Sequence, residues 1–251
     1  MAAPARISAI VITRDRPQLL AAALDGVARQ CVPPLEVRIG DDGEAPATEV
    51  VESAGLLEVV LVRVGAGSAA VARNRAAAGA RGELLAFLDD DDLWRPDHLA
   101  GLVAGFADPA VGVAYRDAAV VHERVAADGT RVELERRVIA RDWDADLMGR
   151  WGYVPPSAMA VRRERFERLG GFDESFRFSE DWDFLLRAAA ASATAPRRVP
   201  GVTVEVRLRE SGNASADRGP ERRECLERLS ARHRLAPIEM ATFWEVAEAV
   251  R

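Results

Sequence analysis

The sequence predicts an α/β fold built on a central, mostly parallel sheet flanked by helices. Three short apolar segments, residues 7–13, 35–40 and 84–88, have the continuous hydrophobicity of strands buried on both faces. Helical periodicity separates them, beginning with a helix that opens at Pro17. The turns between these elements are short. Alternation of this kind indicates right-handed crossovers and a parallel sheet.

The first half of the chain follows this alternation throughout. In the helix that opens at Pro17, the apolar positions fall on one face, and these are Leu20, Ala23, Leu24 and Val27. We expect further helices over residues 49–54 and 69–80 and a third strand over residues 57–64. The loop Gly65-Ala66-Gly67-Ser68 lacks the third glycine and the following acid of a dinucleotide fingerprint, which disfavours a nicotinamide cofactor.

The pattern becomes mixed after residue 106. Two predicted strands, residues 118–125 and 130–138, flank Asp128-Gly129, a strong hairpin signal. The other elements expected here are strands over residues 111–115, 157–162 and 199–208, and helices over residues 164–169, from Ser179 onward, 220–234 and 237–250. We therefore predict one continuous domain with two halves, residues 1–110 and 111–251, the second holding a mixed subregion and C-terminal helices.

Composition narrows the class of protein. The chain has 251 residues, a net charge of −6 and a pI near 5.3, which disfavour a nucleic-acid partner. All 34 basic residues are arginine, so a lysine nucleophile or P-loop lysine is excluded. Two distant cysteines, Cys31 and Cys225, fit a reducing compartment. With no apolar run long enough for a transmembrane segment, we expect a cytoplasmic protein, free or at the inner membrane surface.

The final predicted helix leaves one question of assembly open. Its apolar positions lie on one face, which either packs against the domain or forms a homodimer. These positions are Phe243, Val246, Ala247 and Val250.

Four successive aspartates, residues 89–92, directly follow the apolar segment at 84–88. In parallel α/β sheets this edge is where ligands bind, and Asp41-Asp42 ends a neighbouring predicted strand at the same edge. Carboxylates there suit Mg²⁺ or Mn²⁺ holding a diphosphate. An alternative is that Asp92 or Asp97 only caps the helix after Pro96. The run by itself does not decide between these readings.

Several motifs in order carry a resemblance to a known family. SAIVITRDRP, IGDDG and GSAAVARNRAAAGARGELLAFLDDDDLWRP are followed by FERLGGFDESF and EDWDFLLR. Together they resemble the inverting nucleotide-sugar glycosyltransferases of family 2, and the match runs from about residue 7 to about residue 187. The resemblance implies the GT-A fold and a hexosyl transfer from a UDP- or dTDP-sugar to an acceptor hydroxyl. The acceptor class stays open among glycans, lipid-linked sugars and small molecules.

The resemblance also implies roles for individual residues. Asp181 would be the catalytic base and Asp91 would hold the divalent metal, Mn²⁺ or Mg²⁺. The residues expected to bind the donor are Thr13, Arg14, Asp42, Arg73, Asp89 and Asp90. The residues expected on the acceptor side are Trp151 and Tyr153, from a polar, proline-flanked loop, with Glu180 and Trp182 beside the base.

Two departures from the family pattern stand out. Glu44 follows Asp41-Asp42-Gly43 where serine is usual. The late stretch that carries a metal-binding histidine in many relatives reads Leu208-Arg209-Glu210 here, which leaves three options: Glu210 as a substitute ligand, Arg209 neutralising the diphosphate, or a weaker metal dependence.

Two other functions compete with glycosyl transfer. A sugar nucleotidyltransferase would share the sheet and the metal chemistry, but it would require a glycine-rich N-terminal loop, and IVITRDRP has no glycine. A non-catalytic nucleotide-sugar binding module would fit if Asp181 lay outside the cleft.

Overall fold

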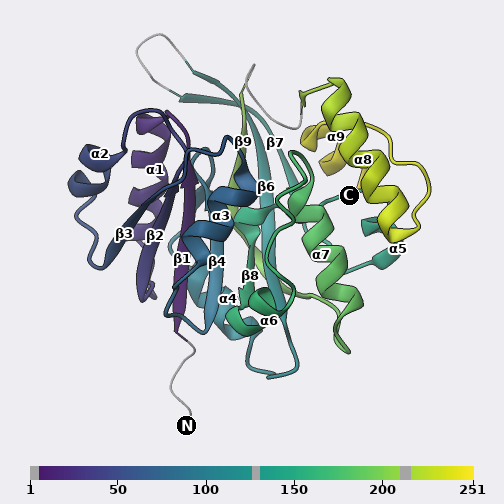
Figure 1. Cartoon of the computed structure of the whole chain (residues 1–251), viewed down its shortest axis with the longest axis horizontal. Helices are drawn as coiled ribbons and strands as arrows, with labels where there is room; N and C mark the ends of the chain where they lie inside the picture. Colours follow the sequence, from purple (N-terminus) through teal and green to yellow (C-terminus); the bar gives the residue numbers. More distant parts are fainter. Residues whose placement is uncertain (1–5, 126–130, 210–215) are drawn as a thin grey trace.

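The computed structural model describes residues 6–125, 131–209 and 216–251 (Figure 1). Its strands are β1 (Ile7–Thr13), β2 (Glu36–Asp41), β3 (Val59–Arg63), β4 (Leu84–Asp89), β5 (Leu93–Trp94), β6 (Val113–Val125), β7 (Arg131–Ile139), β8 (Met159–Arg162) and β9 (Arg197–Leu208). Its helices are α1 (Pro17–Ala28), α2 (Thr48–Ser53), α3 (Ala69–Ala77), α4 (His98–Gly105), α5 (Ala145–Met148), α6 (Arg163–Arg168), α7 (Glu180–Ala190), α8 (Pro220–His233) and α9 (Phe243–Ala249), with a short 3₁₀ turn at Pro156–Ala158.

The first four long strands form the predicted parallel part of the sheet, in the order β3-β2-β1-β4. β1 lies between β2 and β4, with Thr13 opposite Asp41 and Ile12 opposite Asp89. The carboxyl ends of β1, β2 and β4 therefore meet at one edge, as the sequence predicts. This edge brings together segments that are far apart in the chain.

Burial explains why these segments form strands and helices. Residues 84–88 of β4 are fully buried, which matches their uninterrupted apolar sequence. α1 buries Leu20, Ala23, Leu24 and Val27, the four predicted positions, together with Gly26. α3 packs across β1 and β2, and Gly40 of β2 allows this close approach because a Cβ there would lie 2.5 Å from the Ala72 carbonyl oxygen.

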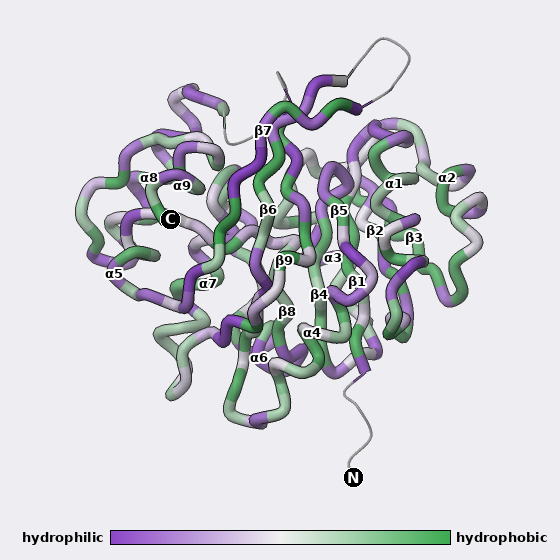
Figure 2. The backbone as a smooth tube through the Cα atoms, turned by 180° about the vertical axis from the view of Figure 1, so that it is seen from behind, coloured by the Kyte–Doolittle hydropathy of each residue, from purple (hydrophilic) through white to green (hydrophobic). Residues whose placement is uncertain are grey.

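The second half completes a mixed sheet in the order β4-β8-β6-β9-β5. β8 is antiparallel to β4 and β6, whereas β9 is parallel to β6. The two strands predicted over residues 111–115 and 118–125 are one continuous strand, β6. β6 and β7 form the predicted antiparallel hairpin, although Asp128-Gly129 lies outside the described residues. β7 alternates between hydrophilic and hydrophobic residues over residues 131–135 and then continues with two further hydrophilic residues, 136 and 137 (Figure 2).

The last predicted helix starts later than expected. The sequence predicts helix over residues 237–250, but α9 begins at Phe243. Thr242 fixes this start with a capping box, in which its hydroxyl accepts from the Glu245 N–H and the Glu245 carboxylate accepts from the Thr242 N–H. α8 and α9 lie beside α7 at the end of the sheet opposite α1 and α2 (Figure 1). Val246, Ala247 and Val250 are buried within the single chain.

The acidic run does not cap the following helix. α4 has Asp97 at its N-cap position, yet the Asp97 side chain makes no capping hydrogen bond and pairs with Arg116 instead. Asp92 is buried and accepts a hydrogen bond from the N–H of Arg207 on β9. Among the described residues, no helix is long and apolar enough to cross a membrane.

Candidate active site

A cavity of about 400 Å³ opens at the edge where β1, β2 and β4 end. Its lining combines this edge with the loop at residues 151–156, the start of α7, and residues of α8 and α9. Eleven of the twelve predicted site residues line it, and these are Thr13, Arg14, Asp42, Arg73, Asp89, Asp90, Asp91, Trp151, Glu180, Asp181 and Trp182. The fold therefore brings the predicted donor and acceptor residues to one place, while their individual roles remain predictions.

The side of the cavity where we predict the donor is built from the ends of β1 and β2 and the loops that follow them. The Thr13 hydroxyl at the end of β1 donates to Asp90, 2.7 Å away, and so joins two neighbouring strand ends. Asp42 accepts from the N–H groups of Ala66 and Gly67, at 2.6 and 3.0 Å. Gly67 has a φ of +64°, a conformation that favours glycine. The loop between β3 and α3 is thus fastened to Asp42.

The two aspartates at the end of β2 differ in role. Asp41 is 1% exposed, pairs with Arg63 at 2.6 Å and accepts from backbone N–H groups of the following turn. It is a structural residue, and only Asp42 reaches the cavity. Glu44, where the family usually has serine, keeps the turn closed through its N–H, which donates to Asp15 at 2.7 Å.

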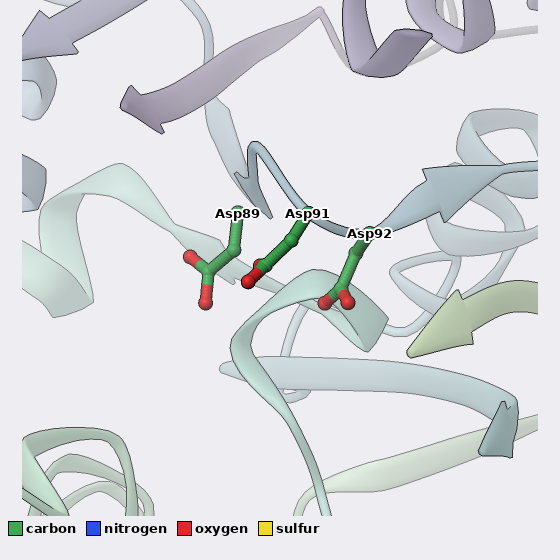
Figure 3. Close-up of side chains that lie close together, drawn as sticks. All are labelled: Asp89, Asp91 and Asp92. Carbon is green, nitrogen blue, oxygen red and sulfur yellow. The ribbon is translucent and has the colours of Figure 1, made fainter. Parts of the chain in front are cut away.

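Three carboxylates of the acidic run form a cluster in the loop between β4 and β5. Asp89, Asp91 and Asp92 each offer an oxygen within 4.8 Å of the others, and Figure 3 shows them pointing to the same side of the loop. From the sequence, Asp91 alone was predicted to bind the metal. Burial is the main cause that raises the pKa of Asp90 to about 6, and it also raises the pKa of Asp92.

Two arginines contact Asp91, and of these the sequence suggested only Arg209, as one option for neutralising the diphosphate. Arg16, which precedes α1, and Arg209, which follows β9, both donate to the same oxygen, Asp91 Oδ2, at 2.9 Å. Arg16 also pairs with Asp90 at 3.3 Å. Arg16 lies in the DRP motif at the strand end, a position that could have suggested it, whereas only the pairing of β9 with β5 and β6 brings Arg209 here.

Arg73 connects the end of β4 to α7. It projects from α3, is 3% exposed, and donates to both oxygens of Asp89 at 2.7 and 2.9 Å and to Glu180 at 2.5 Å. Burial alone would lower its pKa, but the charges of Asp89 and Glu180 raise it, so Arg73 stays cationic. Its contacts in the structure are with these two carboxylates, and its predicted role in binding the donor stays a prediction.

Asp181 occupies the first turn of α7 and is half-buried in the cavity lining. One carboxylate oxygen accepts from the Trp182 N–H at 2.8 Å. Burial, reinforced by the charge of Glu180, raises its pKa to about 7 against the opposing charge of Arg73. A carboxyl with this pKa can exchange a proton near neutral pH.

The far wall of the cavity is largely apolar. Trp151 and Trp182 line it, and the Trp182 ring N–H is fixed by the Met148 carbonyl at 2.7 Å. Tyr153 is the exception among the predicted residues, because it is 1% exposed and bonds to the backbone of Asp142 and Asp144 in the core. The sequence analysis missed the contribution of the C-terminal helices, namely Leu226, Phe243 and Val246.

Comparison with known proteins identifies the family. The model of glycosyl transferase family 2 matches residues 8–170. The chain belongs to this family. It is 29% identical over 240 residues to YwdF, an uncharacterised glycosyltransferase of Bacillus subtilis, and this covers 95% of the chain and 88% of YwdF. It is 32% identical over 170 residues to the pre-mycofactocin glycosyltransferase of Mycobacterium tuberculosis, which covers 63% of this chain and 35% of that protein.

Solved structures of glycosyltransferases share the fold. Staphylococcus aureus TarS, residues 1–349 in complex with UDP-GlcNAc, superposes with a TM-score of 0.68 at 18% identity, covering 98% of this chain and 71% of that one. The mannosyltransferase PcManGT of Pyrobaculum calidifontis, in complex with GDP-Man and Mn²⁺, has a TM-score of 0.64 at 23% identity, covering 99% and 69%. The chain is thus a glycosyltransferase of family 2 with the predicted GT-A fold.

Proposed function

We propose that this glycosyltransferase moves a sugar from a UDP- or dTDP-sugar to an acceptor hydroxyl with inversion at the anomeric carbon. The observation that carries the proposal is that one cavity joins a carboxylate cluster at the donor edge to Asp181 on α7. Residues 1–110 would supply the donor half and residues 111–251 the acceptor half. Family membership sets aside the sugar nucleotidyltransferase and the non-catalytic binding module.

The donor would bind across the ends of β1, β2 and β4. Asp42 would accept from the nucleotide base, and Thr13 and Arg14, which line the same cavity, would lie beside the base. Asp89 and Asp90 offer acceptors for ribose or sugar hydroxyls. Complexes of TarS with UDP-GlcNAc and of PcManGT with GDP-Man support a nucleoside-diphosphate sugar as the donor class.

The chemistry of Asp89, Asp91 and Asp92 fits a divalent ion. Three carboxylates within 4.8 Å of one another are hard oxygen ligands of the kind that Mn²⁺ and Mg²⁺ prefer. Such an ion would offset the charge that grows on the departing nucleoside diphosphate. The Mn²⁺ in the PcManGT complex supports this assignment.

Asp181 would act as the general base. Its carboxylate takes the proton of the acceptor hydroxyl while that oxygen attacks the anomeric carbon and the sugar–phosphate bond breaks. A single displacement of this kind inverts the anomeric configuration. With a pKa of about 7, Asp181 is substantially ionised at neutral pH and still basic enough to accept a proton.

Slow hydrolysis of the donor tests this proposal without knowledge of the acceptor, because water can take the acceptor's place. Each α-linked nucleotide sugar would be incubated with enzyme and Mn²⁺, and the anomer of the released sugar followed by proton NMR before mutarotation. We expect the β-anomer first with one donor and no release by Asp181→Asn. Initial release of the α-anomer would contradict an inverting displacement.

A further inference from the structure

Asp91, in the loop between β4 and β5, is contacted by two arginines from other parts of the chain. Arg16 and Arg209 are nearly two hundred positions apart in the sequence, yet both donate to Asp91 Oδ2 at 2.9 Å. The Asp91 side chain is 24% exposed, Arg16 is 40% exposed and Arg209 is 17% exposed. In this structure the central carboxylate of the cluster therefore has two cationic partners.

These pairs compete with metal binding. A divalent ion on Asp91 would share its carboxylate with two guanidinium groups, whose positive charges repel the ion. A nucleoside diphosphate alone is disfavoured for the opposite reason, because its negative charges would face the carboxylates of residues 89–92. The ion alone is therefore repelled by the two arginines, and the diphosphate alone is repelled by the carboxylates.

The two ligands together remove both conflicts. A divalent cation and the two negative charges of a nucleotide-sugar diphosphate add no net charge to the site. The ion can take Asp91 if the arginines move to the diphosphate, and a guanidinium fork matches phosphate oxygens in geometry as well as charge. Arg73 cannot serve in this way, because Asp89 and Glu180 hold it in a buried position.

We propose that Arg16 and Arg209 form an exchange clamp, which pairs with Asp91 before the donor binds and passes to the donor diphosphate when a divalent ion occupies Asp91. This inference rests on the proposed donor function, and it adds Arg16 as a diphosphate partner and an exchange of both arginines between Asp91 and the diphosphate. It predicts that the ion and the nucleotide each increase the affinity for the other by the same factor, since linkage between two sites is reciprocal.

Calorimetric titration measures this coupling without any turnover. MnCl₂ would be titrated into the protein with and without saturating UDP, and UDP into the protein with Mn²⁺ or with EDTA, with GDP, dTDP and CDP as replacements if UDP does not bind. The variants are Arg16→Gln, Arg209→Gln and the double variant. Arg95→Gln is the matched control, because it removes one arginine that pairs with Glu205 near the same loop.

For the wild type and the Arg95→Gln control we expect Mn²⁺ to bind about tenfold or more tightly when nucleotide is present. In the double variant, Mn²⁺ alone should bind more tightly than to the wild type, and nucleotide in EDTA should bind more weakly. The coupling factor should fall below its wild-type value, leaving only the direct attraction between the ion and the diphosphate. These opposite changes distinguish a clamp from simple damage to the site. Thermal melting verifies folding, and half-exposed Arg16 provides a single variant that does not disturb the core.

Three outcomes would overturn the clamp: equal coupling in the double variant and the wild type, Mn²⁺ affinity without nucleotide that is unchanged or weakened by the substitutions, or independent binding of the two ligands to the wild type. Failure of the proposed function would look different. In that case no nucleoside diphosphate would bind to the wild type, with or without Mn²⁺.

Discussion

Replacing Asp181 with asparagine removes the proposed base while keeping its shape. Asparagine Oδ1 can still accept from the Trp182 N–H, so the first turn of α7 should keep its geometry. A positioned general base typically contributes about 10²- to 10⁴-fold to a rate. We therefore expect kcat to fall by about 10²- to 10⁴-fold. Donor affinity should change little, because the residues proposed to bind the donor base and metal lie at the ends of β1, β2 and β4, whereas Asp181 lies on α7.

The pH profile gives an independent signature of the same residue. Burial and the charge of Glu180 raise the pKa of Asp181 to about 7, so its basic form is depleted as the pH falls below 7. In the wild type, kcat/KM should rise about tenfold per pH unit below pH 7 and level off above it. Asp181→Asn should lack this limb.

The assay is release of nucleoside diphosphate from the donor, with titration calorimetry for donor affinity. Asp146→Asn is the matched control, since Asp146 also lies in the first turn of a helix but is exposed and outside the cavity lining. Wild-type activity and an unchanged ascending limb in Asp181→Asn would refute the base assignment.

Four further substitutions test other parts of the account. Asp91→Asn should abolish the metal-dependent part of nucleotide binding measured by calorimetry, and an unchanged response to Mn²⁺ would remove Asp91 from the metal site. Arg73→Met leaves buried Glu180 and partly buried Asp89 without their cation and should lower the free energy of unfolding by about 3–5 kcal/mol in urea titrations; a loss below about 1 kcal/mol would contradict this role. Trp151→Ala should raise the acceptor KM while nucleotide affinity stays constant, and equal weakening of both would contradict an acceptor-side position. Thr242→Ala should cost about 1 kcal/mol of stability through loss of the α9 cap, and an unchanged melting temperature would argue against that cap.

The local sequence pattern predicted most strands and helices of residues 1–110, because each of these elements is specified by its own residues. The continuous hydrophobicity of residues 84–88 marks a strand buried on both faces, and alternation with helices dictates parallel neighbours. These two facts together predict that Asp42 and the acidic run lie at the same edge of the sheet. α9 was less predictable, because its start depends on a side-chain cap at Thr242 that competes with helical propensity over residues 237–241.

Long-range partners account for what the sequence left out of the site. The sequence offered Arg209 only as one option at the diphosphate, and its contact with Asp91 depends on β9 lying between β6 and β5, a pairing that no local signal specifies. Tyr153 has the sequence context of an exposed aromatic, but its hydroxyl bonds to the Asp142 carbonyl and draws the ring into the core. Polarity of a loop therefore did not determine which of its side chains face the cavity.

The most direct test of the account is thermal unfolding with UDP, GDP, dTDP and CDP, each with Mn²⁺ and with EDTA. A ligand at about 100 times its Kd stabilises the folded state by about 2.7 kcal/mol. For a chain of this size that corresponds to a rise in Tm of about 5–10 °C. We predict such a rise with one nucleotide, UDP or dTDP, in Mn²⁺ and a much smaller rise in EDTA. No rise with any of the four nucleotides in Mn²⁺ would contradict a nucleotide-sugar site in this cavity.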